Sequence, residues 1–451
     1  MNARTLSRIL PVTAFAVLLV PGTAGAIGLE EAVRQALENN NQVSASRYRM
    51  KAAGHRVDAA RSGYLPQVDL QVGARATDNP AQAFIAKLNQ AEVTSQDFRP
   101  GTLNDPDTTT DFATALVLRQ PLYQGGATSA RVTQARSSRE AAGEQFNQTR
   151  LNVALGATRA FLQVQLARAQ VRVTREALEA AREHLRIAED RFETGSALRS
   201  DMLQARTRVS ELEERLLARK NGLALAKSTL NEQLGRGLDA PVRLQQDLGA
   251  ELPPATPDLR SLIRKALAER PAITATEARL AAARARVTEA QAALLPHLNL
   301  EARLEDHRDS GADQSWLAGI RMDWRLFGGG RVATRQAAEA ERFATHAQLT
   351  DTQRKVRLEV RRAKLNLETA RRRLETVRHA VESARESLRT NTNRYRQGAA
   401  TIVEVLDAQL ARHQARARQV EALYDLRLSH ARLQKAVGQT PVLDRLSRNS
   451  G

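Results

Sequence analysis

The stretch RYRQGAATIVEVLDA at residues 394–408 has a counterpart, RFETGSALRSDMLQA, at residues 191–205. In each, a segment with helical character ends at a glycine, Gly398 or Gly195, and a second such segment begins a few residues later. The two stretches are 203 residues apart, and a repeat of this size has to be recognised before any fold is assigned. The chain therefore contains two copies of one structural unit, each with a tight reversal.

The repeat extends through most of the sequence. Leu65-Pro66 recurs as Leu295-Pro296 at an offset of 230 residues, whereas LYQGG at 122–126 recurs as LFGGG at 326–330 at an offset of 204. The first copy therefore carries 26 additional residues (230 minus 204) between its proline and its glycines. We assign the first copy to residues 27–236, a linker with Gly and Pro to 237–257, the second copy to 258–440 and a tail to 441–451.

Residues 1–26 have the pattern of a secretory signal peptide. Arg4 and Arg8 begin the segment, an apolar run follows, and Ala24-Gly25-Ala26 forms a small-residue cleavage site. We therefore expect the mature protein outside the cytoplasm. The chain has no cysteine, which excludes disulfides, thiolate metal sites and a cysteine-linked lipid anchor.

The chain is strongly basic, with a formal net charge of +18. Such a charge would ordinarily suggest nucleic acid or an anionic surface as a partner, but export makes nucleic acid a poor candidate. Arginine and glutamate interleaved on solvated helix faces explain the composition more simply. The 8 histidines are scattered without metal-ligand spacing, and no nucleophile and base are suggested. We expect no enzyme, no metal and no cofactor.

Each copy is predicted to contain one very long helix, at about 127–193 and 331–396. No proline interrupts either segment. About 65 residues at ~1.5 Å each span roughly 100 Å, far more than a small domain can bury. Apolar residues recur alternately every four and three residues, which is a heptad seam, and a second stripe follows a neighbouring face. Two apolar flanks favour a wall of many helices. In the first copy the second stripe includes Leu151, Leu155, Leu162 and Leu166.

Between each Leu-Pro and each glycine cluster, apolar and polar residues alternate with period two, which predicts strands. Strands of about ten residues with one apolar and one charged side are typical of a transmembrane β-barrel. Trp316 and Trp324 on the apolar side are spaced like two aromatic girdles. The expected strands are 67–77, 111–120, 297–306 and 315–326, and a long polar loop between the first two holds the additional residues.

Four strands cannot close a barrel, and open sheet edges are not tolerated in lipid. The missing strands must therefore come from other copies of the chain. Two copies would give eight strands and a filled interior, whereas three would give twelve strands and a lumen lined by the charged residues.

This combination resembles the TolC-like outer-membrane efflux factor family, the outer-membrane channel component of tripartite efflux or type I secretion systems. The resemblance covers nearly the whole mature chain and is most specific in the two tip segments, 191–201 and 394–404, and where strands return to helix at 122–126 and 326–329. It implies a mainly α fold with a small β part. Very long coiled-coil helices would form a periplasmic α-barrel, and four strands per chain would join a trimeric 12-stranded barrel in the bacterial outer membrane.

The resemblance also implies a function. The homotrimer would be a passive exit duct through outer-membrane lipid for small molecules, metal ions or type I secreted proteins. Its inner tip would dock a periplasmic adaptor, the membrane fusion protein, and an inner-membrane pump of RND, ABC or MFS type. The alternatives are an adhesin-like coiled-coil stalk with a barrel anchor and a basic nucleic-acid binder. An adhesin needs one terminal anchor, whereas strands occur in both halves here, and export opposes nucleic acid.

Glu404 and Asp407 are three residues apart on a predicted helix, so their carboxylates share a face. In a trimer they would form a ring at the pore, which would select for cations. This match to the family's acidic constriction predicts a gate. Thr401 and Glu404 also fit a capping box, which is a purely structural role for Glu404.

The family supplies further site residues by resemblance. Asp201 and Tyr395 match an aspartate and a tyrosine whose bonds hold the tip closed, although Ala400 stands where the best-known members carry a basic residue of that lock. The candidate adaptor contacts are the tip-turn residues Gly195, Ser196, Gly398 and Ala399.

Overall fold

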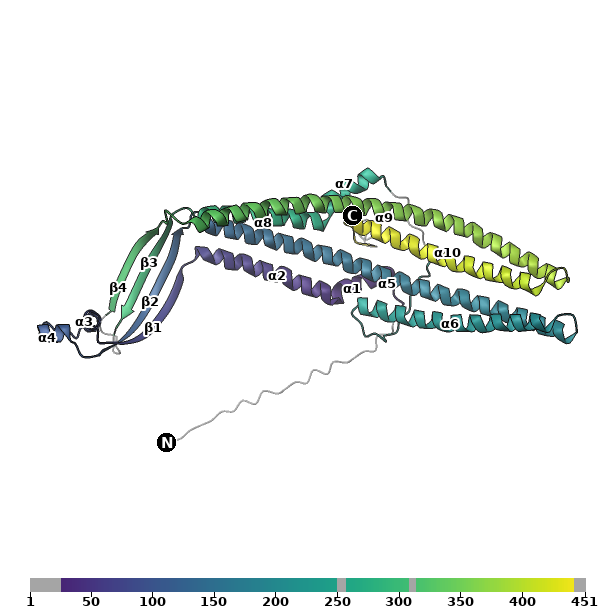
Figure 1. Cartoon of the computed structure of the whole chain (residues 1–451), viewed down its shortest axis with the longest axis horizontal. Helices are drawn as coiled ribbons and strands as arrows, with labels where there is room; N and C mark the ends of the chain where they lie inside the picture. The colour runs from purple at the N-terminus through teal and green to yellow at the C-terminus, as the bar shows by residue number, and fades with distance from the viewer. Residues whose placement is uncertain (1–25, 250–256, 308–313, 442–451) are drawn as a thin grey trace, which may run out of the picture.

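The computed structural model describes residues 26–249, 257–307 and 314–441. The chain is elongated, with a sheet at one end and two helical hairpin tips at the other (Figure 1). This arrangement confirms the mainly α fold class with a small sheet. Apart from Ala26, the expected signal peptide lies outside the described residues, as do residues 250–256 of the linker and 442–451 of the tail.

Every described element of the second copy has a counterpart in the first. The first copy contains α1 (Leu29–Asn39), α2 (Asn41–Arg61), the 3-10 turn η1 (Ser62–Tyr64), β1 (Gln67–Thr77), α3 (Pro80–Asn89), α4 (Pro100–Asn104), β2 (Thr109–Tyr123), α5 (Ala127–Glu193) and α6 (Arg199–Gln233). The second contains α7 (Leu259–Glu269), α8 (Pro271–Ala292), β3 (His297–Asp306), β4 (Gln314–Asp323), α9 (Gly329–Arg396) and α10 (Ile402–Ala436). Among the described residues, η1, α3 and α4 occur in the first copy alone.

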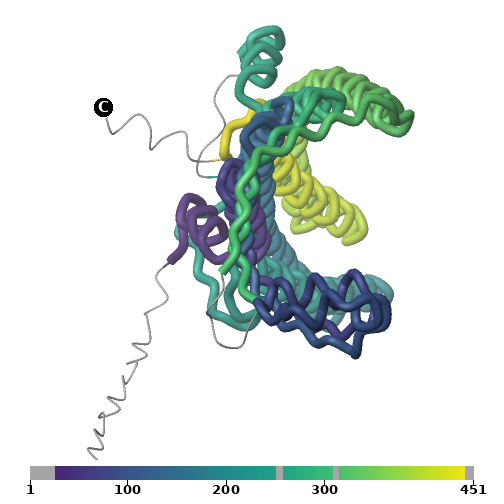
Figure 2. The backbone as a smooth tube through the Cα atoms, turned by 90° about the vertical axis from the view of Figure 1, so that its left-hand side faces the viewer, coloured from purple at the N-terminus to yellow at the C-terminus, as the bar shows by residue number. Residues whose placement is uncertain are grey.

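The long helices α5 and α9 have 67 and 68 residues, which corresponds to about 100 Å each. Helix α5 is central: it packs against α2 and α8 toward the sheet and against α6 and α10 toward the tip. Helix α9 packs against α8, α7 and α10. Viewed along the long axis, these helices form a curved wall with the outline of a C (Figure 2). No helix in the described part of the chain is both long and apolar enough to span a membrane.

In the middle of the wall, equivalent side chains of the two copies make equivalent hydrogen bonds. Asn40, before α2, donates from Nδ2 to the Gln233 carbonyl at the end of α6 (3.4 Å). In the second copy Arg270 occupies the equivalent place and donates to the Ala436 carbonyl (3.1 Å). Arg270 also pairs with Glu359 on α9 (2.6 Å). The same junction is therefore made in both copies, with a charged pair in only one.

The four strands form one antiparallel sheet in the order β1-β2-β3-β4. Val68 lies opposite Leu118, and Leu298 lies opposite Met322, so the apolar residues of all four strands share one face. Most of this face is exposed, in particular Leu70, Val72 and Ile320. The opposite face carries charged pairs such as Arg119 with Asp69 and Arg321 with Glu301. Strands β1 and β4 have no partner on their outer edges within the described chain.

The ends of two strands differ from the expected bounds. β4 ends at Asp323 rather than 326, because Asp323 lies opposite His297, the first residue of β3, and Pro296 before it has no N–H to continue the ladder. β2 is longer than expected because β1 supplies partners back to Thr109 and β3 supplies them on to Tyr123, past an irregularity at Pro121.

The connection between β1 and β2 is also more ordered than the expected polar loop. It contains α3 and α4 and lies beyond the end of the sheet that points away from the long helices (Figure 1). We call residues 78–108 the cap.

Candidate gate at the helical tip

Both hairpins reverse through the same backbone hydrogen bonds. The Ser196 N–H donates to the Arg191 carbonyl (2.8 Å), and the equivalent Ala399 N–H donates to the Arg394 carbonyl (2.8 Å). Gly195 and Gly398 have φ of 70° and 75°, the left-handed conformation that terminates a helix and that glycine adopts at least cost. The backbone of both turns is accessible at the end of the molecule, because all four turn residues are exposed: Gly195, Ser196, Gly398 and Ala399.

The second turn is followed by a capping box. The Glu404 N–H donates to the Thr401 hydroxyl (3.4 Å), and the Thr401 N–H donates to the Glu404 carboxylate (3.4 Å). Arg394 lies 3.8 Å from the same carboxylate. Glu404 therefore has the structural role predicted for it. Its carboxylate interacts with the backbone at the start of α10 and lies near Arg394.

Asp407 lies about one turn further along α10 and differs from Glu404. It is exposed, and its side chain makes no hydrogen bond or ion pair within the described chain. Asp201 lies in the first turn of α6 in the first copy and likewise has no side-chain partner among the described residues. Two carboxylates at the tip are thus available to a neighbouring chain or to a cation.

Tyr395 is nearly buried, at 5% exposure, in an apolar cluster with Ile402 and Val405. Its hydroxyl has no hydrogen-bond partner among the described residues of the chain, so any bond from this hydroxyl that closes the tip would have to be made to another chain. Instead the guanidinium of Arg191 lies over the Tyr395 ring, 4.5 Å from its centre, and donates to the Arg396 carbonyl (3.1 Å). A cation over an aromatic face is an attractive contact. The ends of α5 and α9 are therefore held together by Arg191.

Sequence reasoning did not single out Arg191 or Leu198. Leu198 is the first-copy counterpart of Thr401; it stands at the N-cap of α6 without a side-chain cap and is exposed at the tip. The repeat itself could have revealed this departure, since a capping residue in one copy is replaced by leucine in the other. The contact of Arg191 could not be found in this way, because it depends on how two distant helices pack.

Trp316 and Trp324, the expected girdle residues, are both exposed. Trp316 belongs to the apolar face of β4, opposite Leu304. Trp324 follows the strand and donates from Nε1 to the Leu294 carbonyl (3.3 Å), at the junction of sheet and helices. Within residues 26–249, 257–307 and 314–441, no group of three or more His, Asp or Glu side chains is arranged to hold a metal ion.

A curved wall of very long helices, joined to a small sheet with an exposed apolar face, defines the class of protein as an outer-membrane export channel. A family model described as outer membrane efflux protein matches residues 32–236 and 262–439. The chain belongs to this family.

Individual proteins that this chain resembles are consistent with this family. The pyoverdine export outer membrane protein OpmQ of Pseudomonas aeruginosa is 27% identical over 92% of this chain and 84% of its own length. The alkaline protease secretion protein AprF of the same species is 26% identical over 76% of this chain and 70% of its own. The solved structure of the outer membrane protein VceC from Vibrio cholerae shares the fold with a TM-score of 0.76, at 22% identity over 91% of this chain and 96% of that chain.

Proposed function

We propose that three copies of this chain assemble into one duct, with a twelve-stranded barrel in the outer membrane and a helical tunnel in the periplasm. The observation that carries the proposal is a difference between equivalent residues of the two repeats. Leu162 on α5 is 1% exposed, whereas Leu365, its counterpart 203 residues on in α9, is 53% exposed.

The cause of this difference is the position of each helix in the wall. The second copy covers the flank of α5 through α8 and α10, whereas no described element of the chain covers the corresponding flank of α9. Leu358 is exposed for the same reason, while its counterpart Leu155 packs against buried residues of the wall. A neighbouring molecule that offers its α2 and α6 to α9 would repeat the internal contact. Repetition of one contact around an axis closes a ring.

The sheet supports the same assembly. Its two free edges belong to β1 and β4, and lipid does not tolerate unpaired backbone groups. Pairing β4 of one chain with β1 of the next removes every edge. Three chains supply twelve strands, enough to leave a lumen lined by the polar face.

The duct is passive, and an inner-membrane pump drives export through a periplasmic adaptor. One relative is named for export of pyoverdine and another for secretion of an alkaline protease. Channels of one family thus serve cargoes as different as these, which supports the proposal that the pump selects the cargo. The pump would be of RND, ABC or MFS type. The exposed turns at Gly195–Ser196 and Gly398–Ala399 are the proposed adaptor contacts.

The tip is the proposed gate. Around a threefold axis, Glu404 and Asp407 would give six carboxylates, which attract cations when held at a constriction. Arg191 and Tyr395 hold the two hairpins of each chain together beside this ring. Asp201, which has no side-chain partner among the described residues of its own chain, is available to the neighbouring chain.

The assembly is tested by the mass of the detergent-solubilised particle and by conductance in planar bilayers. We expect three copies and an ion-conducting pore. Leu365→Glu, which puts a charge on the uncovered flank of α9, should yield monomers. Ile85→Glu, at an equally exposed position on the cap, is the matched control and should leave the trimer intact. A monomeric wild-type particle would contradict the proposal.

A further inference from the structure

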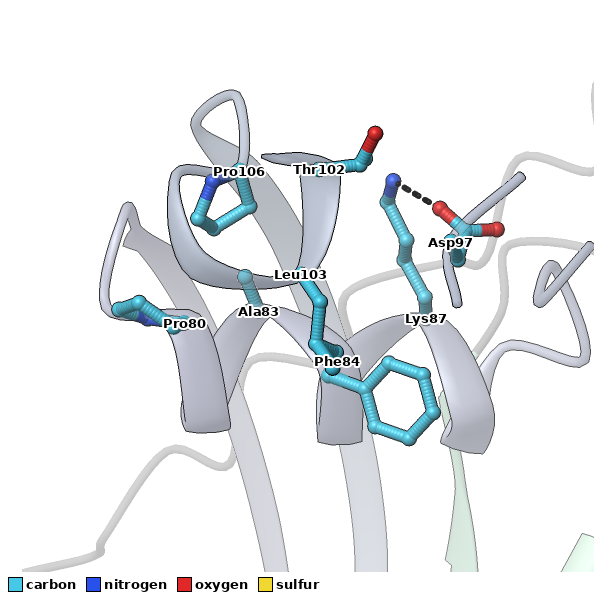
Figure 3. Close-up of a pocket in the computed structure, with 8 residues that line it drawn as sticks. All are labelled: Pro80, Ala83, Phe84, Lys87, Asp97, Thr102, Leu103 and Pro106. Atoms are coloured by element: carbon cyan, nitrogen blue, oxygen red, sulfur yellow. Dashed lines mark hydrogen bonds and ion pairs between the residues drawn. The ribbon is translucent and has the colours of Figure 1, made fainter. Parts of the chain in front are cut away.

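The cap is a small folded unit rather than a loose loop. Helix α3 follows Asn79, its N-cap, and its own residues Ala83 and Ala86 are buried. The rings of Phe84 and Phe98 meet edge to face at 5.6 Å. Pro80, Phe84, Leu103 and Pro106 line a shallow apolar pocket, and Lys87 pairs with Asp97 beside it at 2.9 Å (Figure 3). Together with the buried Ala83 and Ala86, these side chains form the small core of this unit.

Polar side chains fasten the end of α3 to the sheet. Gln90 donates from Nε2 to the Thr110 carbonyl (2.8 Å) and to the Asp111 carboxylate (3.2 Å) on β2. Asn89 Nδ2 lies 3.3 Å from Nε2 of His307, which directly follows β3. Residues from three separate elements therefore meet at this corner of the sheet.

His307 is the centre of the group. Its Nδ1 lies 2.9 Å from the Asp111 carboxylate and its Nε2 lies 3.4 Å from the Glu305 carboxylate. The two carboxylates face different ring nitrogens, so the imidazole bridges them and they do not converge on a metal. The side chains of His307 and Asp111 are only 10% and 14% exposed. We call Asp111, Glu305 and His307, together with Asn89 and Gln90, the histidine cluster.

The cluster identifies the face to which the cap is attached. Asp111 and Glu305 alternate along their strands with the apolar Phe112 and Leu304, so they belong to the charged face of the sheet. Arg303 on that face binds Glu305 through two hydrogen bonds of 2.7 and 2.8 Å. If the sheet is part of a barrel, this face lines the lumen. The cap is then held over the opening and away from the lipid.

We propose that the cap is a lid over the outer mouth of the channel and that the histidine cluster is its latch. The inference rests on the proposed barrel. Three lids, one from each chain, would narrow the mouth until their latches release. This lid lies at the opposite end of the molecule from the tip gate, and none of its residues takes part in that gate.

The chain has no cysteine, so single engineered cysteines can report which surfaces water reaches. Gly73 lies on the charged face, two residues from Arg75, which is opposite Asp111, and a Cβ there meets no atom within 4 Å. Gly73→Cys is therefore a reporter just below the lid. Val72→Cys, on the exposed apolar face, is the matched control. A bulky, membrane-impermeant maleimide is added outside intact cells that make each variant, and the labelling rate is measured.

We expect slow labelling of Gly73→Cys and about tenfold faster labelling when His307→Ala is added, since loss of even one hydrogen bond to a charged group can shift a closed–open equilibrium by this factor. Asp111→Asn, which preserves shape, should act in the same direction. His297→Ala, at the other end of β3, should not. Equal rates with and without His307 would overturn the lid. In the His307→Ala background, where the lid is open, labelling of Val72→Cys as fast as that of Gly73→Cys would instead overturn the barrel on which the lid depends.

Discussion

The carboxylates of Glu404 and Asp407 lie about one helical turn apart on α10, but their surroundings differ. Glu404 takes part in the capping box and lies near Arg394, whereas the Asp407 side chain has no partner in the part of the chain that the structure describes. We therefore expect Asp407→Asn to account for most of the loss of cation selectivity seen in the double variant Glu404→Gln/Asp407→Asn. Planar-bilayer reversal potentials and block by multivalent cations would measure this effect. Asp58→Asn, an exposed change on α2, is the control, and unchanged selectivity in the double variant would refute the acidic ring.

A second residue-scale prediction concerns Arg191 and Tyr395. Arg191 makes a cation–π contact and a hydrogen bond between the hairpin ends, whereas the Tyr395 hydroxyl has no hydrogen-bond partner among the described residues. We expect Arg191→Gln to loosen the tip and raise single-channel conductance. Tyr395→Phe keeps the ring beneath Arg191 and should leave conductance close to wild type. If Tyr395→Phe opened the channel as much as Arg191→Gln, the hydroxyl and not the arginine would hold the tip.

At the scale of single elements, we expect the stability of the cap to depend on pH through Asp97. The hydrogen bond from Lys87, with further bonds from the Thr94 N–H and hydroxyl, lowers the pKa of Asp97 to about 2. A carboxyl whose pKa is lowered by folding stabilises the folded form above its unfolded pKa, and this contribution is lost as the pH falls toward the folded value. We expect the cap to remain ordered at pH 5 and to loosen between about pH 4 and 2. Hydrogen exchange of residues 80–104 would follow this, and Asp97→Asn should abolish the pH step.

The elements also show which features a sequence can predict. The long helices follow from uninterrupted heptad spacing, and the strands from alternation, because both patterns are local. The end of β4, in contrast, depends on a contact with a distant part of the sequence. Asp323 pairs with His297, the first residue of β3, and Pro296 ends the pairing. The cap was expected as a loop because α3 has only 10 residues and is held by contacts with β2 and His307. For the same reason the stacking of Arg191 on Tyr395 was not predictable, whereas the positions of Glu404 and Asp407 were.

At the scale of the whole molecule, the internal repeat predicts how one chain should meet the next. Within the chain, β2 of the first copy pairs with β3 of the second, and Leu116 lies opposite Leu304. The position equivalent to Leu116 is Ile320 on β4, 204 residues on, and the position equivalent to Leu304 is Ala74 on β1, 230 residues back. If neighbouring chains repeat the internal contact, Ile320 of one chain lies opposite Ala74 of the next.

This register can be measured directly by a double variant, Ala74→Cys with Ile320→Cys, in a chain that has no other cysteine. Within one chain the two positions lie on opposite edge strands and are also about eight residues out of register, which places them about 30 Å apart, too far for a disulfide. We predict oxidation to covalent dimers and trimers that reductant returns to monomers, and little cross-linking for Ala74→Cys with Gly319→Cys, whose second cysteine faces the other side of the sheet. Absence of cross-linked species from the Ala74–Ile320 pair, or equal cross-linking by both pairs, would contradict a closed barrel built by repeating this chain's own internal contact.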